Sequence, residues 1–374
     1  MDASSWNYRN DCTRAISAGG PMVLLILISI FVAGCGGGSS SSSQPTSPGL
    51  WVANRIPNSV TGFSAGARKH SGTPAATFTN SSTGLNDPEG LTFDKHHNMW
   101  VANCAGSDDL FGSITEFTQG QLGKLKQDPA PGPAVELMDD GSGAVFNCPY
   151  GLEFDQSGNL WVSNRFTPEL ISFSPDQLQQ SGVQPPDTTI FSTHFGGLED
   201  LLFDKEGTLW IADAAVASVF GYKSATLAAA LGQTVAVDPD IINSSAALNL
   251  PDALAFDRDG NQWVANCNNN NLVRFNAADI AMSGAPTPEI TLTSTAVTTA
   301  SGTAESLDCP EGITFDPSGN LWVSNAISDT FGSLAKFTPS QLAASGSPAP
   351  AVFLDADSMG GNLNQPVLID FGPP

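Results

Sequence analysis

Four acidic residues recur at one place in the 374-residue sequence. Each lies four positions before the aromatic residue of a phrase that returns along the chain, and they are Glu89, Glu199, Asp252 and Glu311. If the phrase is one unit of structure, the four carboxylates meet in space. Clustered carboxylates suit a hard cation, Ca²⁺ above all. Without a cation they would repel one another, and their pKa values would rise.

Amide side chains recur in the same phrase, three positions after its tryptophan. They are Asn54, Asn103, Asn164, Asn266 and Asn325, with Asp213 in the remaining copy. Their oxygens suit the same cation or another ligand, although such side chains at strand ends also cap neighbouring backbone. Arg55 and Arg165 directly follow two of them, and Tyr150 takes the acidic place in one copy. We expect all of these residues to form a ligand-binding set, although the arginines could simply pair with the acidic residues.

The phrase is an internal repeat, and its fold must position these side chains. Its full copies are GLTFDKHHNMWVANC (90–104), GLEFDQSGNLWVSNR (151–165), DLLFDKEGTLWIADA (200–214), DALAFDRDGNQWVAN (252–266) and GITFDPSGNLWVSNA (312–326). With the half-copy LWVANR (50–55), six tryptophans follow one another about 54 residues apart. Alternating apolar residues and a recurring glycine turn indicate four strands in each unit. Six such units predict an all-β, six-bladed β-propeller of four-stranded blades, with an open β solenoid as the alternative.

The two ends of the repeat region predict how the ring closes. The half-copy at 50–55 lacks its first strand, and residues 366–371 align with residues 310–315, the first strand of the last full copy. A C-terminal strand should therefore complete the first blade of a propeller over residues 50–374. Because first strands line the channel of a propeller, the acidic residues should converge at its mouth. A wide, water-filled mouth that needs no metal is the alternative to a calcium site.

The copy PEGITFDPSGNLWVSN (310–325) resembles an NHL repeat. The six-unit arrangement over residues 50–374 is similar to the superfamily that contains the senescence-marker-protein and gluconolactonase hydrolases. In those enzymes the metal ligands occupy positions equivalent to Glu89, Glu199, Asp252 and Glu311, so the resemblance implies a metal site here. It also implies lactone or ester hydrolysis as one possible activity, although this fold hosts enzymes, receptors and scaffolds alike.

Four of the six cysteines fall into two equivalent pairs. Cys104 and Cys267 each lie four residues after a repeat tryptophan, whereas Cys148 and Cys309 each lie six residues before a first-strand aromatic residue. Each pair would join the end of one blade's second strand to the entry of the next blade. We therefore predict the disulfides Cys104–Cys148 and Cys267–Cys309, with buried free thiols as the alternative.

The first 49 residues indicate export and a lipid anchor. Residues 22–33 are apolar, which suits a signal peptide and is too short to span a bilayer. The following Gly-Cys resembles a lipobox, so we expect a signal peptide over 1–34 and a lipidated Cys35 that anchors the chain to a membrane. A Gly/Ser/Pro-rich tether would follow over 35–49. Gly36 after the cysteine favours the outer membrane of a bacterial cell envelope, on its periplasmic or surface face; an ordinary signal peptide is the alternative.

Composition excludes several classes of function. The formal net charge of −23 leaves no clustered cations for nucleic-acid phosphates. No nucleotide or organic cofactor is expected. Of the four histidines only His194 comes near the predicted mouth, which does not support a three-histidine zinc site and leaves His194 as a weak candidate for a general base.

Two functions remain. The first is a lipid-anchored, non-catalytic, monomeric propeller that presents a binding face to a protein, peptide or glycan, with Ca²⁺ at the mouth as an option. The second is a metal-dependent hydrolase of lactones or esters at the acidic mouth. The regularity of all six units and the absence of a convincing base favour binding.

Overall fold

The computed structural model describes the following residues: 49–71, 78–80 (backbone only), 84–104, 112–124, 131–139, 141, 145–300, 302–326, 332–355 and 363–372. All of them belong to the compact unit that spans Gln44–Pro374. The predicted signal peptide, Cys35 and the tether up to residue 48 lie outside the described residues. Within the described part, no helix combines the length and apolar character needed to cross a membrane.

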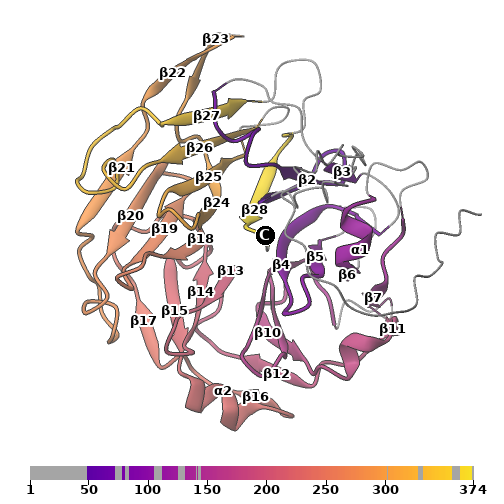
Figure 1. Ribbon diagram of the computed structural model, residues 1–374. Helices are drawn as coiled ribbons and strands as arrows, with labels where there is room; N and C mark the ends of the chain where they lie inside the picture. Colours follow the sequence, from indigo (N-terminus) through magenta and orange to yellow (C-terminus); the bar gives the residue numbers. More distant parts are fainter. Residues whose placement is uncertain are drawn as a thin grey trace, which may run out of the picture. The chain divides into compact units, whose positions relative to one another are not determined.

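Six antiparallel sheets form the blades of a β-propeller, as the repeat predicts (Figure 1). The first strand of each blade lies at the centre and packs against the first strand of the next blade, all the way round. From blade 1 to blade 6 these first strands are β28 (Pro366–Asp370), β4 (Pro88–Phe93), β8 (Pro149–Phe154), β13 (Leu198–Phe203), β18 (Pro251–Phe256) and β24 (Pro310–Phe315). They line the central channel.

The second strands carry the repeat tryptophans, which are all buried. They are β1 (Leu50–Asn54), β5 (Met99–Asn103), β9 (Leu160–Asn164), β14 (Leu209–Asp213), β19 (Gln262–Asn266) and β25 (Leu321–Asn325). Every residue of these six strands is buried, because each lies inside a blade and packs against the blades on both sides. This explains why the phrase around the tryptophan is the best-preserved part of the repeat within the chain.

The third and fourth strands complete each blade toward the outside. The third strands are β2 (Ser59–Phe63), β6 (Ser113–Phe117), β10 (Glu169–Phe173), β15 (Ser218–Tyr222), β20 (Asn271–Phe275) and β26 (Ser333–Phe337), and the fourth are β3 (Phe78–Asn80), β7 (Val135–Met138), β12 (Thr188–Phe191), β17 (Ile241–Asn243), β21 (Ile290–Thr293) and β27 (Val352–Asp355). Short helical segments connect them in three blades: α1 (Gln119–Leu122), η1 (Gln177–Gln179) and α2 (Ser224–Ala230).

The ring closes through the C-terminal strand, as predicted. Strand β28 pairs antiparallel with β1, so that Trp51 lies opposite Asp370 and Val52 opposite Ile369. The first blade is therefore built from both ends of the repeat region, and this pairing closes the ring of blades.

Two blades have a fifth strand that the repeat did not predict. Strand β11 (Gly182–Val183) pairs parallel with β7, and β16 (Thr234–Ala236) pairs parallel with β12. In each case the chain of one blade covers the outer edge of the preceding blade, which removes an unpaired edge that could aggregate. A hairpin of β22 (Ala296–Thr299) and β23 (Gly302–Glu305) is also inserted before blade 6. Neither feature shares the repeat phrase, so the sequence pattern contained no signal for them.

The aspartate after the first-strand aromatic residue organises the next turn. In blade 3, Asp155 Oδ1 accepts hydrogen bonds from the backbone of Ser157 and Asn159, and its Oδ2 accepts one from Trp161 Nε1 at 3.2 Å. Gly158 takes the positive φ of +87° that the turn requires. The turn thus fixes the tryptophan and, through it, the register of the second strand.

Candidate binding site at the channel mouth

A β-bulge at the start of each first strand presents the acidic residues at the channel mouth. In blade 2, Pro88 lies opposite Asn103 and Gly90 opposite Ala102, which leaves Glu89 as the extra residue. Asp252 and Glu311 are the extra residues of equivalent bulges in blades 5 and 6. Bulges re-aim side chains at the rims of barrels and next to binding sites. We call the six equivalent residues the mouth ring: Val367, Glu89, Tyr150, Glu199, Asp252 and Glu311.

The amide at the end of each second strand is buried and serves the backbone. Asn103 Oδ1 accepts the N–H of Asn86, and its amide N–H donates to Gly84, Ser113 and Thr115. In four other blades the backbone N–H three residues before the mouth-ring residue donates to the equivalent side-chain oxygen. The accepting residues are Asn54, Asp213, Asn266 and Asn325. Asn164 is bound instead through its N–H to Val145. These side chains cap neighbouring backbone at the strand ends, which is the alternative role given for them above.

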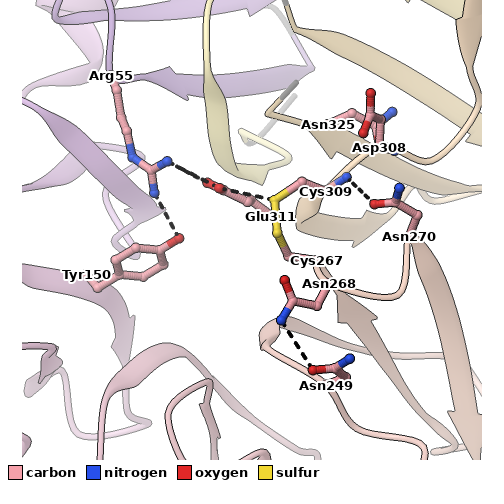
Figure 2. The surroundings of a disulfide bond; sticks show 10 residues. All are labelled: Arg55, Tyr150, Asn249, Cys267, Asn268, Asn270, Asp308, Cys309, Glu311 and Asn325. Atoms are coloured by element: carbon pink, nitrogen blue, oxygen red, sulfur yellow. Dashed lines mark hydrogen bonds and ion pairs between the residues drawn. A yellow bond between two sulfur atoms is a disulfide. The ribbon is translucent and has the colours of Figure 1, made fainter. Parts of the chain in front are cut away.

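Arg55 of blade 1 bonds to mouth-ring residues of three other blades. Its Nε lies 2.8 Å from Oε2 of Glu89, and its Nη1 lies 2.9 Å from Oε2 of Glu311. Its Nη2 donates a longer hydrogen bond of 3.4 Å to the Tyr150 hydroxyl (Figure 2). Arg55 therefore occupies the space in which a cation held by Glu89 and Glu311 would lie.

Arg165 serves the opposite side of the ring. Its Nε lies 2.9 Å from Oε1 of Glu199, and its guanidinium lies over the Tyr150 ring, 5.3 Å from the centroid. The tyrosine thus separates the two guanidinium groups while contacting both. Asp252 differs from the other acidic members, because no hydrogen bond or ion pair reaches its carboxyl from the described residues.

Burial raises the pKa of every acidic member of the mouth ring. The pKa of Glu89 rises to about 7, because desolvation outweighs the attraction of Arg55. Desolvation also raises the pKa of Glu311, and it raises those of Glu199 and Asp252 well above their ordinary values, with further contributions from neighbouring carboxylates. Mutual repulsion was the expected cause of these raised pKa values, whereas burial is the larger cause.

The four carboxyls do not form one compact cage. Within the described ranges, two sets of three potential ligands lie within 4.8 Å of one another, and each combines one ring glutamate with a cystine: Glu89 with Cys104 and Cys148, and Glu311 with Cys267 and Cys309. Sulfur in a disulfide is not the thiolate that binds metal. Calcium binding stays a prediction, and Arg55 and Arg165 already supply positive charge to this ring.

Both predicted disulfides are present. Cys104 is bonded to Cys148, and Cys267 to Cys309. Figure 2 shows that the second disulfide adjoins the mouth ring, with Cys309 Sγ 3.6 Å from Glu311 Oε1. Each disulfide ties the end of one blade's second strand to the entry of the next blade's first strand, which was the basis of the prediction.

His194 lies on the connection from blade 3 to blade 4 and is exposed. Its ring is 6.5 Å from the ring of Phe220 in the third strand β15, and no interaction joins it to Glu199 among the described residues. Its use as a general base would therefore require a substrate that reaches toward the outer strands of blade 4.

A second acidic cluster, missed by the sequence argument, lines the channel beyond the mouth ring. Glu153, Asp200 and Asp370 project from the first strands of blades 3, 4 and 1 into a cavity of about 310 Å³. Desolvation and mutual repulsion raise the pKa of Glu153 to about 8, and desolvation raises those of Asp200 and Asp370 to about 7. Glu153 and Asp370 share the position directly before the first-strand aromatic residue, but the other copies have Thr92, Leu202, Ala255 and Thr314 there, and Asp200 lies at a different position, so no recurring acidic column marked the cluster.

Exposed apolar side chains surround the mouth. The turn after each second strand follows the buried amide, and in three blades it carries a large exposed residue: Ile56 at 45%, Phe166 at 66% and Val216 at 45% exposure. Single exposed apolar side chains are common on protein surfaces, but these three follow the second strand at the same end of the propeller as the mouth ring, so they offer apolar contacts beside the charged mouth. We call these three residues the apolar rim.

Fold comparisons define the class of protein as a six-bladed β-propeller. No family model matches the chain, and no curated protein matches it. A protein of unknown function from Bacteroides caccae shares the fold with a TM-score of 0.53 and 11% identity, over 88% of this chain and all of that one. The same applies to a chain of a nidogen–laminin complex, with a TM-score of 0.52 and 12% identity over 87% of this chain and 98% of that one.

A more distant likeness is to a catalytically inactive virginiamycin B lyase from Staphylococcus aureus with quinupristin. Its TM-score is 0.39 and its identity 13%, over 68% of this chain and 67% of that one, so it carries no argument. The particular resemblance to NHL repeats and to the gluconolactonase superfamily stays a prediction.

Proposed function

We propose that this propeller is a non-catalytic binding module whose mouth face holds a protein, peptide or glycan partner. The apolar rim carries the proposal, because three equivalent turns place Ile56, Phe166 and Val216 in solvent around a charged mouth. Interfaces typically combine such apolar contacts with a few well-placed charges. The nidogen–laminin neighbour is a protein–protein assembly on this fold, which supports the proposal by analogy alone.

The mouth ring fits recognition better than hydrolysis. Glu89, Glu199 and Glu311 are held in ion pairs with arginines, and no histidine contacts the ring among the described residues. A hydrolase would need a cation and an available base at the same place. A metal-dependent lactonase is therefore the second candidate, supported only by the unpaired carboxyl of Asp252.

We further propose that a lipid on Cys35 anchors the propeller at a bacterial cell envelope, in the outer membrane. The lipobox-like sequence before Cys35 supports this location. Metabolic labelling with radioactive palmitate should mark the full chain, and a Cys35→Ser variant should lose the label. Equal labelling of the two proteins would contradict the anchor.

Site-specific photo-crosslinking tests the binding face. We expect the full chain with benzoylphenylalanine in place of Phe166 to form a discrete, saturable adduct in cells that express it. The matched control places the same probe at Met282, which is 73% exposed and lies outside the rim. Equal adducts at both positions, or none at Phe166, would contradict the proposal.

A metal titration separates the second candidate. Calcium that raises the melting temperature of the full chain, together with lactone hydrolysis that Glu89→Ala abolishes, would support the hydrolase. Neither effect is expected from a binding module that relies on its arginines.

A further inference from the structure

One backbone position makes the same hydrogen bond in every blade, to the entry of that blade's own first strand. It directly follows the buried amide, and its N–H donates to the residue two before the mouth ring in all six blades: Arg55 to Gln365, Cys104 to Asp87, Arg165 to Cys148, Ala214 to Gly197, Cys267 to Leu250 and Ala326 to Cys309. We call it the link position. Because this hydrogen bond is the same in every blade, side chains at the six link positions start from equivalent places around the mouth.

Four of the six link positions bond to the following blade. Arg55 reaches Glu89 and Arg165 reaches Glu199, each at the mouth-ring position of the next blade. Cys104 and Cys267 form the two disulfides to the next blade. The remaining two positions hold alanine.

The two alanines face different neighbours. Ala326 precedes blade 1, whose mouth-ring residue is the apolar Val367, so no cation is needed there. Ala214 precedes blade 5, whose mouth-ring residue is Asp252. At this one place an acidic residue of the ring lacks the arginine that its equivalents have.

Asp252 is buried and lacks a partner within the described residues. It is 5% exposed, and it is the extra residue of the β-bulge that presents the first strand of blade 5 at the mouth. The neighbouring Glu199 also has one carboxylate oxygen, Oε2, that is buried without a hydrogen-bond partner. A buried carboxylate oxygen without a hydrogen-bond partner costs free energy, which a cation from a bound partner beside Glu199 and Asp252 would recover.

We propose that the bound partner supplies the missing cation, as an arginine or lysine side chain of a peptide segment that enters beside Ala214 and pairs with Asp252 and Glu199. The inference rests on the proposed function and narrows its partner to a basic peptide or protein. A guanidinium is the group that this ring already accepts at two equivalent places. The apolar rim residues Phe166 and Val216 lie on the turns next to Arg165 and Ala214, where they would contact the peptide around the charged side chain.

Binding of small probes to the full chain tests the inference. N-acetyl-arginine amide is titrated by calorimetry against N-acetyl-citrulline amide, which has the same shape without the charge. We expect citrulline to bind at least tenfold more weakly. Ala214→Arg places a guanidinium of the chain itself beside Asp252 and Glu199. Asp252→Asn removes the negative charge of the Asp252 carboxylate. Each variant should bind N-acetyl-arginine amide at least tenfold more weakly.

Ala326→Arg is the matched control, because it adds the same side chain at the equivalent position beside Val367 and should leave arginine binding unchanged. Equal binding of arginine and citrulline, or arginine binding that survives Ala214→Arg, would overturn the inference. If the chain binds calcium but not arginine, and Asp252→Asn abolishes the calcium binding, then the site at Asp252 and Glu199 is a metal site and the inference is wrong. A crosslink at Phe166 with no arginine binding would retain the proposed function and reject only this inference.

Discussion

The cost of a buried charge in the channel can be measured as the change in the free energy of unfolding when Glu153 is replaced. Its carboxyl lies with those of Asp200 and Asp370 in the channel cavity and accepts a hydrogen bond from Thr92 Oγ1 at 3.3 Å. Its pKa rises from 4.5 to about 8, first through desolvation and then through the charges of Asp370 and Asp200. Glutamine keeps the shape and can still accept the bond from Thr92, so Glu153→Gln removes only the ionisation.

The direction of the effect follows from proton linkage. Between pH 4.5 and about 8 the native state holds this proton while the unfolded state has lost it, so stability falls as pH rises through that range. Each unit of pKa shift corresponds to about 1.4 kcal/mol. Because the cavity lets solvent screen part of the charge, we expect Glu153→Gln to raise the free energy of unfolding by about 1–2 kcal/mol at pH 8.5. At pH 4.5 it should change little.

Urea denaturation followed by tryptophan fluorescence measures this difference at pH 4.5, 6, 7 and 8.5. The control Glu206→Gln changes an exposed glutamate and should stay within about 0.5 kcal/mol at every pH. A Glu153→Gln effect that is the same at pH 4.5 and 8.5, or a loss of stability at pH 8.5, would refute the reasoning, because neither can arise from a penalised buried charge.

Three further predictions concern the ring. Arg55→Met should lower the free energy of unfolding at pH 8 by about 3–5 kcal/mol, because Glu89 and Glu311 remain buried without their cation, and urea denaturation at pH 5 should show a smaller loss; an equal loss at both pH values would point to packing instead. Cys148→Ser should cost about 2–4 kcal/mol in the same assay under oxidising conditions and nothing after full reduction, whereas a loss that persists in reductant would contradict a cross-link effect. A stop codon at Pro366 removes β28 and should abolish the cooperative transition, and a truncated chain that still unfolds cooperatively would show that the first blade does not need its C-terminal strand.

The repeat made most of the fold predictable from the sequence. Buried second strands with tryptophan and a glycine turn need the same residues in every blade, so the strand order, the closing strand and both disulfides followed from alignment within the chain. The fifth strands β11 and β16 were not predictable, because they pair through backbone atoms and place few demands on side chains. The same reason applies to the β22–β23 hairpin, which has no equivalent in the other blades.

The mouth ring was predictable in position but only partly in chemistry. Alignment placed Glu89, Glu199 and Asp252 on equivalent first strands, yet it could not decide whether an arginine or a metal would meet them. That choice depends on how far the Arg55 and Arg165 side chains reach across the channel, a distance that no repeat spacing encodes. The cluster of Glu153, Asp200 and Asp370 stayed hidden because only two of its members share a repeat position, and the other copies carry no acidic residue there.

The link positions leave one joint of the circle without a side-chain bond. Disulfides and ion pairs of the link residues Cys267, Arg55, Cys104 and Arg165 connect blade 5 through blades 6, 1, 2 and 3 to blade 4. Between blades 4 and 5 the link residue is Ala214, so this joint relies on other contacts, such as the hydrogen bond that the Leu254 N–H donates to Asp200. A cationic ligand that pairs with both Glu199 and Asp252 would add the side-chain bond between these two blades that the other joints already have.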